Sequence, residues 1–305
     1  LVQRFGRQIL KYGKIDGIVG TGDLEKVREV VEEVLKGKIK IEVGEKPFQT
    51  RKEFPRLLLT YPYAYLKISE GCNNFCNYCL IPYLRGPLRS RKIKDIIEEA
   101  KGMEKLGIKE IILIAQDTPS YGKDLNDGTN LISLLKKLAK MDFPWIRILY
   151  AHPAHIDENL LNTIAEEEKI CNYLDIPLQH IHPDILKKMG RPVCDYYRLI
   201  EKIRKKIPDI SIRTTFIVGF PGEEDNHFNY LLDFVKSVRF DKVGIFKYSR
   251  EKGTPAYFLG DPVAEDVKEE RKRLLMELQR EISKNKLKEK VGKRLEVIVE
   301  RKEKD

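Results

Sequence analysis

Three of the five cysteines in this 305-residue chain lie within one short stretch, SEGCNNFCNYCLIPYLRG. Cys72, Cys76 and Cys79 have the spacing CxxxCxxC. Clustered cysteines in an odd number are not typical of a secreted disulfide framework. Three thiolates are also one ligand short of a closed structural zinc site. The pattern therefore indicates a metal centre with one coordination position left for another group.

Two kinds of metal centre fit the three cysteines. A zinc site needs a fourth ligand, which His152, His155 or His180 could supply through folding, and it would suit a non-catalytic, zinc-binding nucleic-acid module. An iron–sulfur cluster instead prefers several soft thiolates. Three cysteines would hold three irons of a four-iron cluster and leave the fourth open to the amino and carboxylate groups of S-adenosylmethionine. A reduced cluster could then donate one electron to the sulfonium and release a 5′-deoxyadenosyl radical.

The elements that must position these residues follow a regular rhythm of apolar runs and amphipathic stretches. The apolar runs, which we predict as strands, are YAYLKIS (63–69), EIILIA (110–115), WIRILYA (145–151), NYLDIPL (172–178), SIRTTFIVG (211–219) and KVGIFKYS (242–249). The stretches predicted as helices are 93–107, 130–141, 157–168, 196–208, 225–238 and 264–289. Six β-then-α units imply a parallel α/β sheet with right-handed crossovers.

The segments after the strands distinguish between an open doubly wound sheet and a barrel. No GxGxxG follows the first strand, whereas polar, Gly- or Pro-rich loops such as QDTPSYGKD, HPAHID and FPGEED follow the later ones. In a barrel these loops share one rim, where active sites are built. We therefore predict an open, partial (β/α)6 barrel of the TIM type with the cysteines at its rim.

The flanks predict a division into three parts. Residues 1–56 read as a leader with a helix that starts near Asp23 and ends before Gly37, followed by a loop at 43–57. Residues 57–290 hold the repeating units. In residues 291–305 Leu295, Val297 and Val299 alternate like the first strand of another sheet. Because the chain does not begin with Met, we expect it to be the central part of a longer protein.

Composition sets only broad limits on function. The net charge is +10 and the pI about 9.1, which permits a ribonucleoprotein or nucleic-acid partner. However, 34% of residues are charged, with both signs, which also suits a heat-adapted surface. No run approaches the roughly 18 apolar residues of a membrane helix, and no signal peptide is evident. We expect a soluble protein of the cytoplasm that contacts no membrane.

Several motifs carry a closer resemblance. The stretches YAYLKISEGCNNFCNYCLIPYLRGPLRSR, EIILIAQDT, IRILYAHP, YLDIPLQH, RTTFIVGFPGE and KYSREKGTPA resemble the radical S-adenosylmethionine methylthiotransferases over residues 57–290. AQDT, LYAHP and DIPLQH are similar to the branch that modifies ribosomal protein S-twelve, the RimO type. The transfer-RNA branch, which modifies isopentenylated adenosine, remains the alternative.

The resemblance implies a transferase that adds a methylthio group to the β-carbon of an aspartate in ribosomal protein S-twelve. It implies one [4Fe–4S] cluster on Cys72, Cys76 and Cys79, S-adenosylmethionine, an electron donor, and proximity to ribosomal RNA or transfer RNA. Family members carry a second cluster in an N-terminal domain and end in a small β-barrel, the TRAM domain. The segment 291–305 resembles its first strand, so we expect this chain to be limited to cluster binding and reductive cofactor cleavage.

The same resemblance suggests residues for the S-adenosylmethionine site, and the sequence alone assigns no catalytic residue. These candidates are Tyr78, Gln116, Asp117, Gln179, Arg191, Gly219 and Tyr248. Tyr78 would cover the cluster, and an arginine suits a carboxylate through paired hydrogen bonds. A glycine lets backbone approach a flat ligand closely. Ordinary alternatives stand beside each role: a turn before Pro119 for Asp117, a solvated side chain for Arg191, and a Pro-Gly turn for Gly219.

Overall fold

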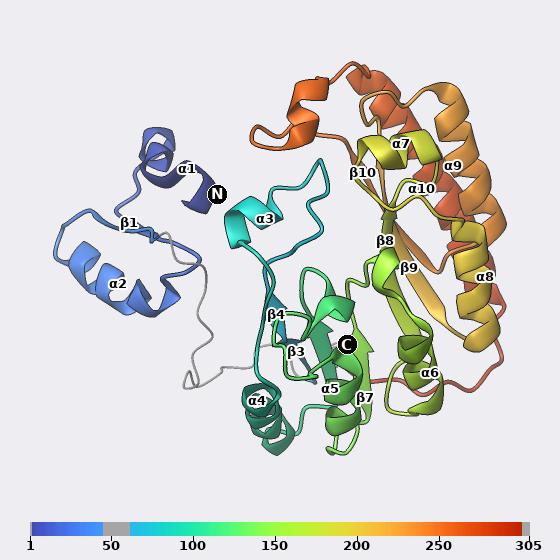
Figure 1. Cartoon of the computed structure of the whole chain (residues 1–305), viewed down its shortest axis with the longest axis horizontal. Helices are drawn as coiled ribbons and strands as arrows, with labels where there is room; N and C mark the ends of the chain where they lie inside the picture. Colours follow the sequence, from blue (N-terminus) through green and yellow to red (C-terminus); the bar gives the residue numbers. More distant parts are fainter. Residues whose placement is uncertain (1, 45–61, 301–305) are drawn as a thin grey trace, which may run out of the picture.

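Parallel strands alternating with helices make up most of the structure, a computed structural model that describes residues 2–44 and 62–300 (Figure 1). The six principal strands are β3 (Tyr63–Lys67), β6 (Glu110–Ile114), β7 (Trp145–Ile148), β8 (Tyr173–Gln179), β9 (Ser211–Val218) and β10 (Lys242–Lys247). Each falls within or beside an apolar run predicted from the sequence. Their β-branched and aromatic content suits strands. In β3, β7 and β9 buried residues alternate with less buried ones, so one face of each strand carries the core.

The six strands follow the order of the chain and form two three-stranded sheets. β3, β6 and β7 pair in parallel, as do β8, β9 and β10. β7 and β8 meet through the bridge between Ile146 and Ile170 and through the hydrogen bond from Ala151 N to Asp175 O, at 2.8 Å. No pairing joins β3 to β10 within the described ranges. The predicted open, partial barrel is therefore confirmed.

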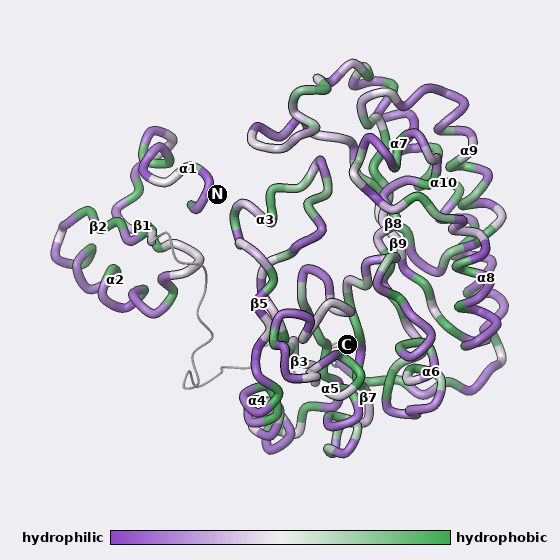
Figure 2. The backbone as a smooth tube through the Cα atoms, in the orientation of Figure 1, coloured by the Kyte–Doolittle hydropathy of each residue, from purple (hydrophilic) through white to green (hydrophobic). Residues whose placement is uncertain are grey.

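Helices cover the outer face of this sheet (Figure 1). They are α4 (Ile93–Lys105), α5 (Leu131–Leu138), α6 (Glu158–Glu166), α8 (Tyr196–Lys206), α9 (Asp225–Val238) and α10 (Glu265–Lys288). In α5 the buried Leu131, Leu134, Leu135 and Leu138 form one stripe, the spacing of an amphipathic helix. Asn130 and Ser133 form a capping box at its start. Figure 2 shows the resulting alternation of apolar and polar segments along the helices.

Residues 2–44 form a small βαβ unit that was not predicted from the sequence. It contains α1 (Val2–Phe5), β1 (Gly17–Val19), α2 (Val27–Leu35) and β2 (Lys40–Glu42), and β1 pairs with β2 in parallel. The helix predicted from Asp23 is α2, preceded by one 3₁₀ turn. Asp23 does not cap it; its carboxylate accepts a hydrogen bond from Gly44 N instead.

Three further differences concern short or terminal segments. Two short helices beside the cysteines, α3 (Ile81–Arg85) and α7 (Pro183–Lys188), were not predicted. The strand predicted near residues 295–299 is absent: residues 293–300 have no regular structure, and Leu295, Val297 and Val299 are exposed. Such a segment has no neighbouring strand here to satisfy its backbone hydrogen bonds. The predicted loop at 43–57 lies almost wholly outside the described residues.

No helix in the described parts of the chain combines the length and apolar character needed to cross a membrane. The longest helix, α10, carries many charged side chains and packs against β10 and α9.

The buried centre of β6 gives a direct test of the core. Leu113 is fully buried, so Leu113→Ala should lower the free energy of unfolding by about 2–5 kcal/mol, through lost transfer energy and a cavity. Leu106, at the end of α4, is 59% exposed, and Leu106→Ala should change it by less than about 0.5 kcal/mol. Urea unfolding of both variants measures this. Equal losses would contradict the placement of β6 in the core.

Candidate cluster and cofactor site

The cysteine loop leaves the end of β3 through a tight backbone turn. Gly71 has a φ of +80°, and a Cβ there would lie 2.0 Å from Pro87 O. Only glycine avoids that collision. Cys72 N then donates to Gly86 O, at 3.2 Å. The first cysteine is thus fixed against the segment that follows α3.

Each of the three sulfur atoms has a hydrogen-bond donor nearby. Asn74 N donates to Cys72 Sγ at 3.5 Å, and Ile81 N donates to Cys79 Sγ at 3.4 Å. The guanidinium of Arg191 donates to Cys76 Sγ at 3.7 Å. Burial raises the pKa of Cys72 and of Cys79 above the usual thiol value. A cation that binds these thiols must therefore displace their protons.

Asn77, in the middle of the loop, joins segments from three parts of the sheet. Its backbone N donates to Met189 O at 2.9 Å, and its side chain donates to Lys188 O at 2.9 Å, both at the end of α7. Its carbonyl accepts a hydrogen bond from Ala256 N at 2.8 Å, beyond β10. The loop after the first strand is therefore bound to segments that follow β8 and β10.

Below the loop lies a small hydrophobic core, separate from the main one. Its buried members are Ile185, Met189, Phe220, Tyr248 and Ala256, with Tyr78 and Ile217 packed against it. Tyr248 OH donates to Ala256 O at 3.1 Å, and its ring meets Phe220 edge-on. Tyr78 and Tyr248, both predicted for the site, thus belong to one packed cluster. Burial raises the pKa of Tyr78 well above its usual value, so its hydroxyl stays neutral.

Asp117 is buried and accepts hydrogen bonds from three side chains. They are Asn74 Nδ2 at 2.9 Å, Ser120 Oγ at 2.8 Å and His155 Nδ1 at 2.6 Å. Burial alone would raise the pKa of Asp117, but the hydrogen bonds from His155 and Asn74 outweigh it and lower the pKa to about 2. The carboxylate is therefore ionised, and it ties the cysteine loop to the loops after β6 and β7.

Two further buried side chains, Arg191 and His152, lie in the same region, and their charges affect each other. Arg191 is 7% exposed; besides Cys76, its guanidinium donates to Pro177 O, and its Nε has no partner in the described structure. Burial, followed by the positive charge of Arg191, lowers the pKa of His152 to about 3. The arginine predicted for the site thus lies buried beside a cysteine sulfur, and the solvated alternative is wrong.

The remaining residues predicted for the cofactor site are Gln116, Gln179 and Gly219. Gln116 Nε2 lies 3.4 Å from Glu70 Oε1, and its own Oε1 is buried without a partner. Gln179 has a φ of +70° and a buried, unpartnered Oε1. Gly219 has a φ of +71°, and a Cβ there would lie 2.3 Å from Lys268 Cγ. A larger residue at this position would collide with the side chain of Lys268, a residue of α10.

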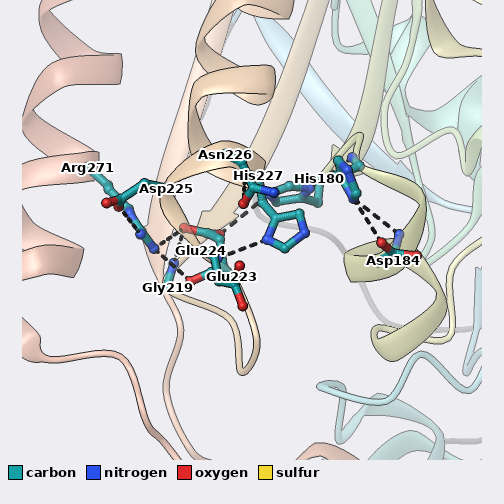
Figure 3. A network of polar contacts seen from close by, with 10 residues as sticks. His180, Asp184, Gly219, Glu223, Glu224, Asp225, Asn226, His227 and Arg271 are labelled. Atoms are coloured by element: carbon teal, nitrogen blue, oxygen red, sulfur yellow. Dashed lines mark hydrogen bonds and ion pairs between the residues drawn. The ribbon is translucent and has the colours of Figure 1, made fainter.

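The sequence analysis missed a buried network behind Gly219 (Figure 3). Glu223 Oε1 accepts hydrogen bonds from Gly219 N at 3.0 Å and from Arg271 at 2.8 Å. Its other oxygen lies 3.5 Å from His180 Nε2, and both of these atoms lack a hydrogen-bond partner. The FPGEE motif marked the turn, but nothing in the sequence paired it with α10.

A hollow of about 670 Å³ opens beside α3. It is lined by Tyr83, Lys252, Gly253, Thr254, Pro255, Tyr257 and Phe258. None of the residues predicted for the cofactor lines it. It lies next to the cysteine loop, since a Cβ on Gly253 would meet Leu80 at 3.3 Å.

The chain is similar to known proteins over most of its length. The family model described as the radical SAM superfamily matches residues 66–235, which run from the end of β3 through the cysteine loop to β9 and α9. A radical S-adenosylmethionine methyltransferase, TsrM, from Kitasatospora setae shares the fold at a TM-score of 0.62 and 15% identity, over 84% of this chain and 57% of that one. Since the family match covers more than half of the chain, the protein is a radical S-adenosylmethionine protein.

Curated relatives define the family more narrowly. The ribosomal protein uS12 methylthiotransferase RimO of Thermoanaerobacter sp. (strain X514) is 46% identical over 98% of this chain and 70% of its own length. Those of Heliobacterium modesticaldum and Clostridioides difficile are 47% and 44% identical, over 63% and 69% of their lengths. The chain belongs to the RimO family of methylthiotransferases, which are transferases of the radical S-adenosylmethionine type.

This family implies a [4Fe–4S] cluster and S-adenosylmethionine as cofactors, and the residues fit them. Three thiols on one loop each have a donor to sulfur. His152 and His155, considered as fourth zinc ligands, are instead engaged with Ala154 N and Asp117.

The turn at Gly71 should be essential for metal loading. Gly71→Ala places a Cβ against Pro87 O, so the loop must shift and Cys72 with it. We expect the iron content after anaerobic reconstitution to fall at least about tenfold. Gly102→Ala, in α4 with nothing within 4 Å, is the matched control and should keep full iron. Full iron in Gly71→Ala would show that the turn does not position the loop.

His152 should make stability depend on pH. Its pKa is about 3 in the fold against 6.5 ordinarily, so the folded protein binds fewer protons. This contribution is fully present above pH 6.5 and is lost as the pH falls toward 3. Between pH 7 and pH 5, unfolding should become easier by up to about 2 kcal/mol more in the wild type than in His152→Gln. Urea unfolding at the two pH values measures the difference; parallel losses would exclude a buried neutral His152.

Proposed function

We propose that this protein adds a methylthio group to the β-carbon of an aspartate in ribosomal protein uS12, using a [4Fe–4S] cluster on Cys72, Cys76 and Cys79. The observation that carries the proposal is the CxxxCxxC loop at the carboxyl ends of the parallel strands, in a chain of the RimO family. That rim is where (β/α) enzymes bind substrates. For residues 1–305 the proposed share is cluster binding and reductive cleavage of the cofactor.

A radical explains the choice of cofactors. The β-carbon of an aspartate side chain is not acidic enough for ordinary base catalysis at neutral pH. When bound, the cluster and S-adenosylmethionine supply a one-electron cleavage that yields a carbon radical able to remove such a hydrogen. The protein contributes binding, orientation and exclusion of water.

The chain's own residues have separable tasks in this proposal. The three cysteines hold the cluster, and Arg191, buried beside Cys76, offsets the negative charge of the thiolates. Asp117 is ionised and hydrogen-bonded, so it can orient a cationic amino group without taking its proton. Tyr78 and Tyr248 seal the inner side of the loop against water. Gln116 and Gln179 each have a buried oxygen without a partner in the described structure, available to a donor on the cofactor.

The proposed partners are uS12 as substrate and an electron donor. The relatives whose names are given above are described as acting on uS12. If the protein modified transfer RNA in place of uS12, it would belong to the other branch of the methylthiotransferases. Mass spectrometry of uS12 peptides and transfer-RNA nucleosides from a deletion strain distinguishes the two.

A cysteine exchange tests the cluster ligands. Cys72→Ala should lose most of the iron and nearly all reductive cleavage of S-adenosylmethionine, because one of three iron ligands is gone. Cys194→Ala is the matched control: this cysteine is free and exposed, and its exchange should leave both unchanged. Iron analysis and 5′-deoxyadenosine release by anaerobic, reduced protein measure the effects. Full iron in Cys72→Ala would refute the ligand assignment, and a zinc-loaded, colourless wild type would refute the cluster.

A further inference from the structure

A second group of metal-ligating side chains lies away from the cysteine loop. His182 and Asp184 stand at the start of α7, after β8, and His227 stands in the first turn of α9, after β9. Figure 3 shows these two segments facing each other. One ligand atom from each residue lies within 4.8 Å of the others, and no other such group of three occurs in the described part of the chain.

The three side chains are held in place by their surroundings. His227 is 8% exposed, and its ring meets that of His182 edge-on, with 4.3 Å between centroids. Tyr230, one turn further along α9, covers the other side of His182, 5.6 Å from its ring. Asp184 is exposed, and its Oδ2 lies 3.8 Å from His182 Nδ1. Two imidazoles from different elements are thus packed together, with an exposed carboxylate beside them.

Each ring already uses one nitrogen. His227 Nδ1 accepts a hydrogen bond from Glu224 N at 2.9 Å, and His182 Nδ1 accepts one from Asp184 N at 3.3 Å. Ligation through Nε2 would move the ring proton to Nδ1 and give up these cap bonds, of which that of His182 is the longer.

We propose that His182, Asp184 and His227 bind one divalent transition-metal ion of the zinc type, with water completing its coordination. Imidazole and carboxylate ligands suit such an ion, whereas iron–sulfur clusters and Cu(I) select thiolates. Ligands at about 2.0–2.1 Å from zinc lie roughly 3.3 Å apart. Closing the group to that spacing requires side-chain rotation, for which Asp184 is exposed.

The bound ion would join the two loops that flank the buried centre of the rim. α7 is six residues long, about 9 Å, and the carbonyls at its far end hold Asn77 of the cysteine loop. The loop before His227 carries Glu223, whose carboxylate faces His180. The ion therefore fixes α7 relative to α9 at a site separate from the three cysteines.

Metal binding to the cluster-loaded protein tests this inference. Anaerobically reconstituted chain is dialysed against chelator-buffered Zn²⁺, and zinc and iron are counted together. We expect one zinc per chain beyond the iron, with nitrogen and oxygen but no sulfur neighbours in zinc-edge X-ray absorption. At a free Zn²⁺ concentration a hundred times Kd, the apparent Tm should rise by about 4 °C.

Variants locate the site. His182→Gln and His227→Gln should each weaken zinc binding at least about tenfold and cut the rise in Tm to about half or less at the same free Zn²⁺ concentration, with iron content unchanged. Asp233→Asn, an exposed carboxylate on the same helix α9, is the control and should bind as the wild type. Sulfur neighbours, no zinc in the wild type, or wild-type affinity in both variants would each overturn the proposal. If a variant fails to fold, the stoichiometry and absorption spectrum of the wild type decide.

Discussion

The fold depends on how the open edge of its sheet is closed. β3 and β10 are the two ends of a six-strand array and do not pair with each other in the described structure. The cysteine loop bridges the gap at the rim: Asn77 makes backbone and side-chain hydrogen bonds to the end of α7 and accepts one from Ala256. The loop proposed to hold the cluster therefore also links the segments that follow the two edge strands of the sheet.

This double role explains the unusual burial beneath the loop. A guanidinium seldom lies buried without a carboxylate partner, because desolvation is costly. Arg191 is stabilised instead by a backbone carbonyl and by Cys76, and its charge is best compensated when that sulfur is a thiolate. Burial meanwhile raises the pKa of Cys72 and Cys79. The proposed cluster would place thiolates beside this buried positive charge, so its loading should be linked to local stability.

The sequence was sufficient for the features that depend on periodicity. Six apolar runs and six amphipathic stretches predicted the six principal strands and six covering helices. Burial of a strand, or of one face of a helix, leaves a pattern of apolar residues that can be read locally in the sequence. α3 and α7 escaped because five or six residues carry too little pattern. The alternation of Leu295, Val297 and Val299 misled for the opposite reason: a strand needs a neighbouring strand, which no local pattern supplies.

The site residues that could be predicted from the sequence differ from the others in the same respect. Cys72, Cys76 and Cys79 were visible because their spacing lies within one loop, whereas the contact between Asp117 and His155 joins loops 38 residues apart. Gly219 was predicted to admit a ligand, yet Lys268 of α10 fills the space where its side chain would be. In each case the missing information was the identity of a distant partner.

The two proposed metal sites raise the question of how each would select its ion. The thiol loop offers soft ligands with hydrogen-bond donors to sulfur, which favours an iron–sulfur cluster. The imidazole group on α7 and α9 is compact and contains no sulfur, so it cannot supply the thiolates that a cluster requires. Ligand softness therefore keeps the two centres apart even though α7 touches both. Each site can select its own metal because the two sets of ligands differ. The six-residue helix α7 then needs only to keep the histidines apart from the cysteines.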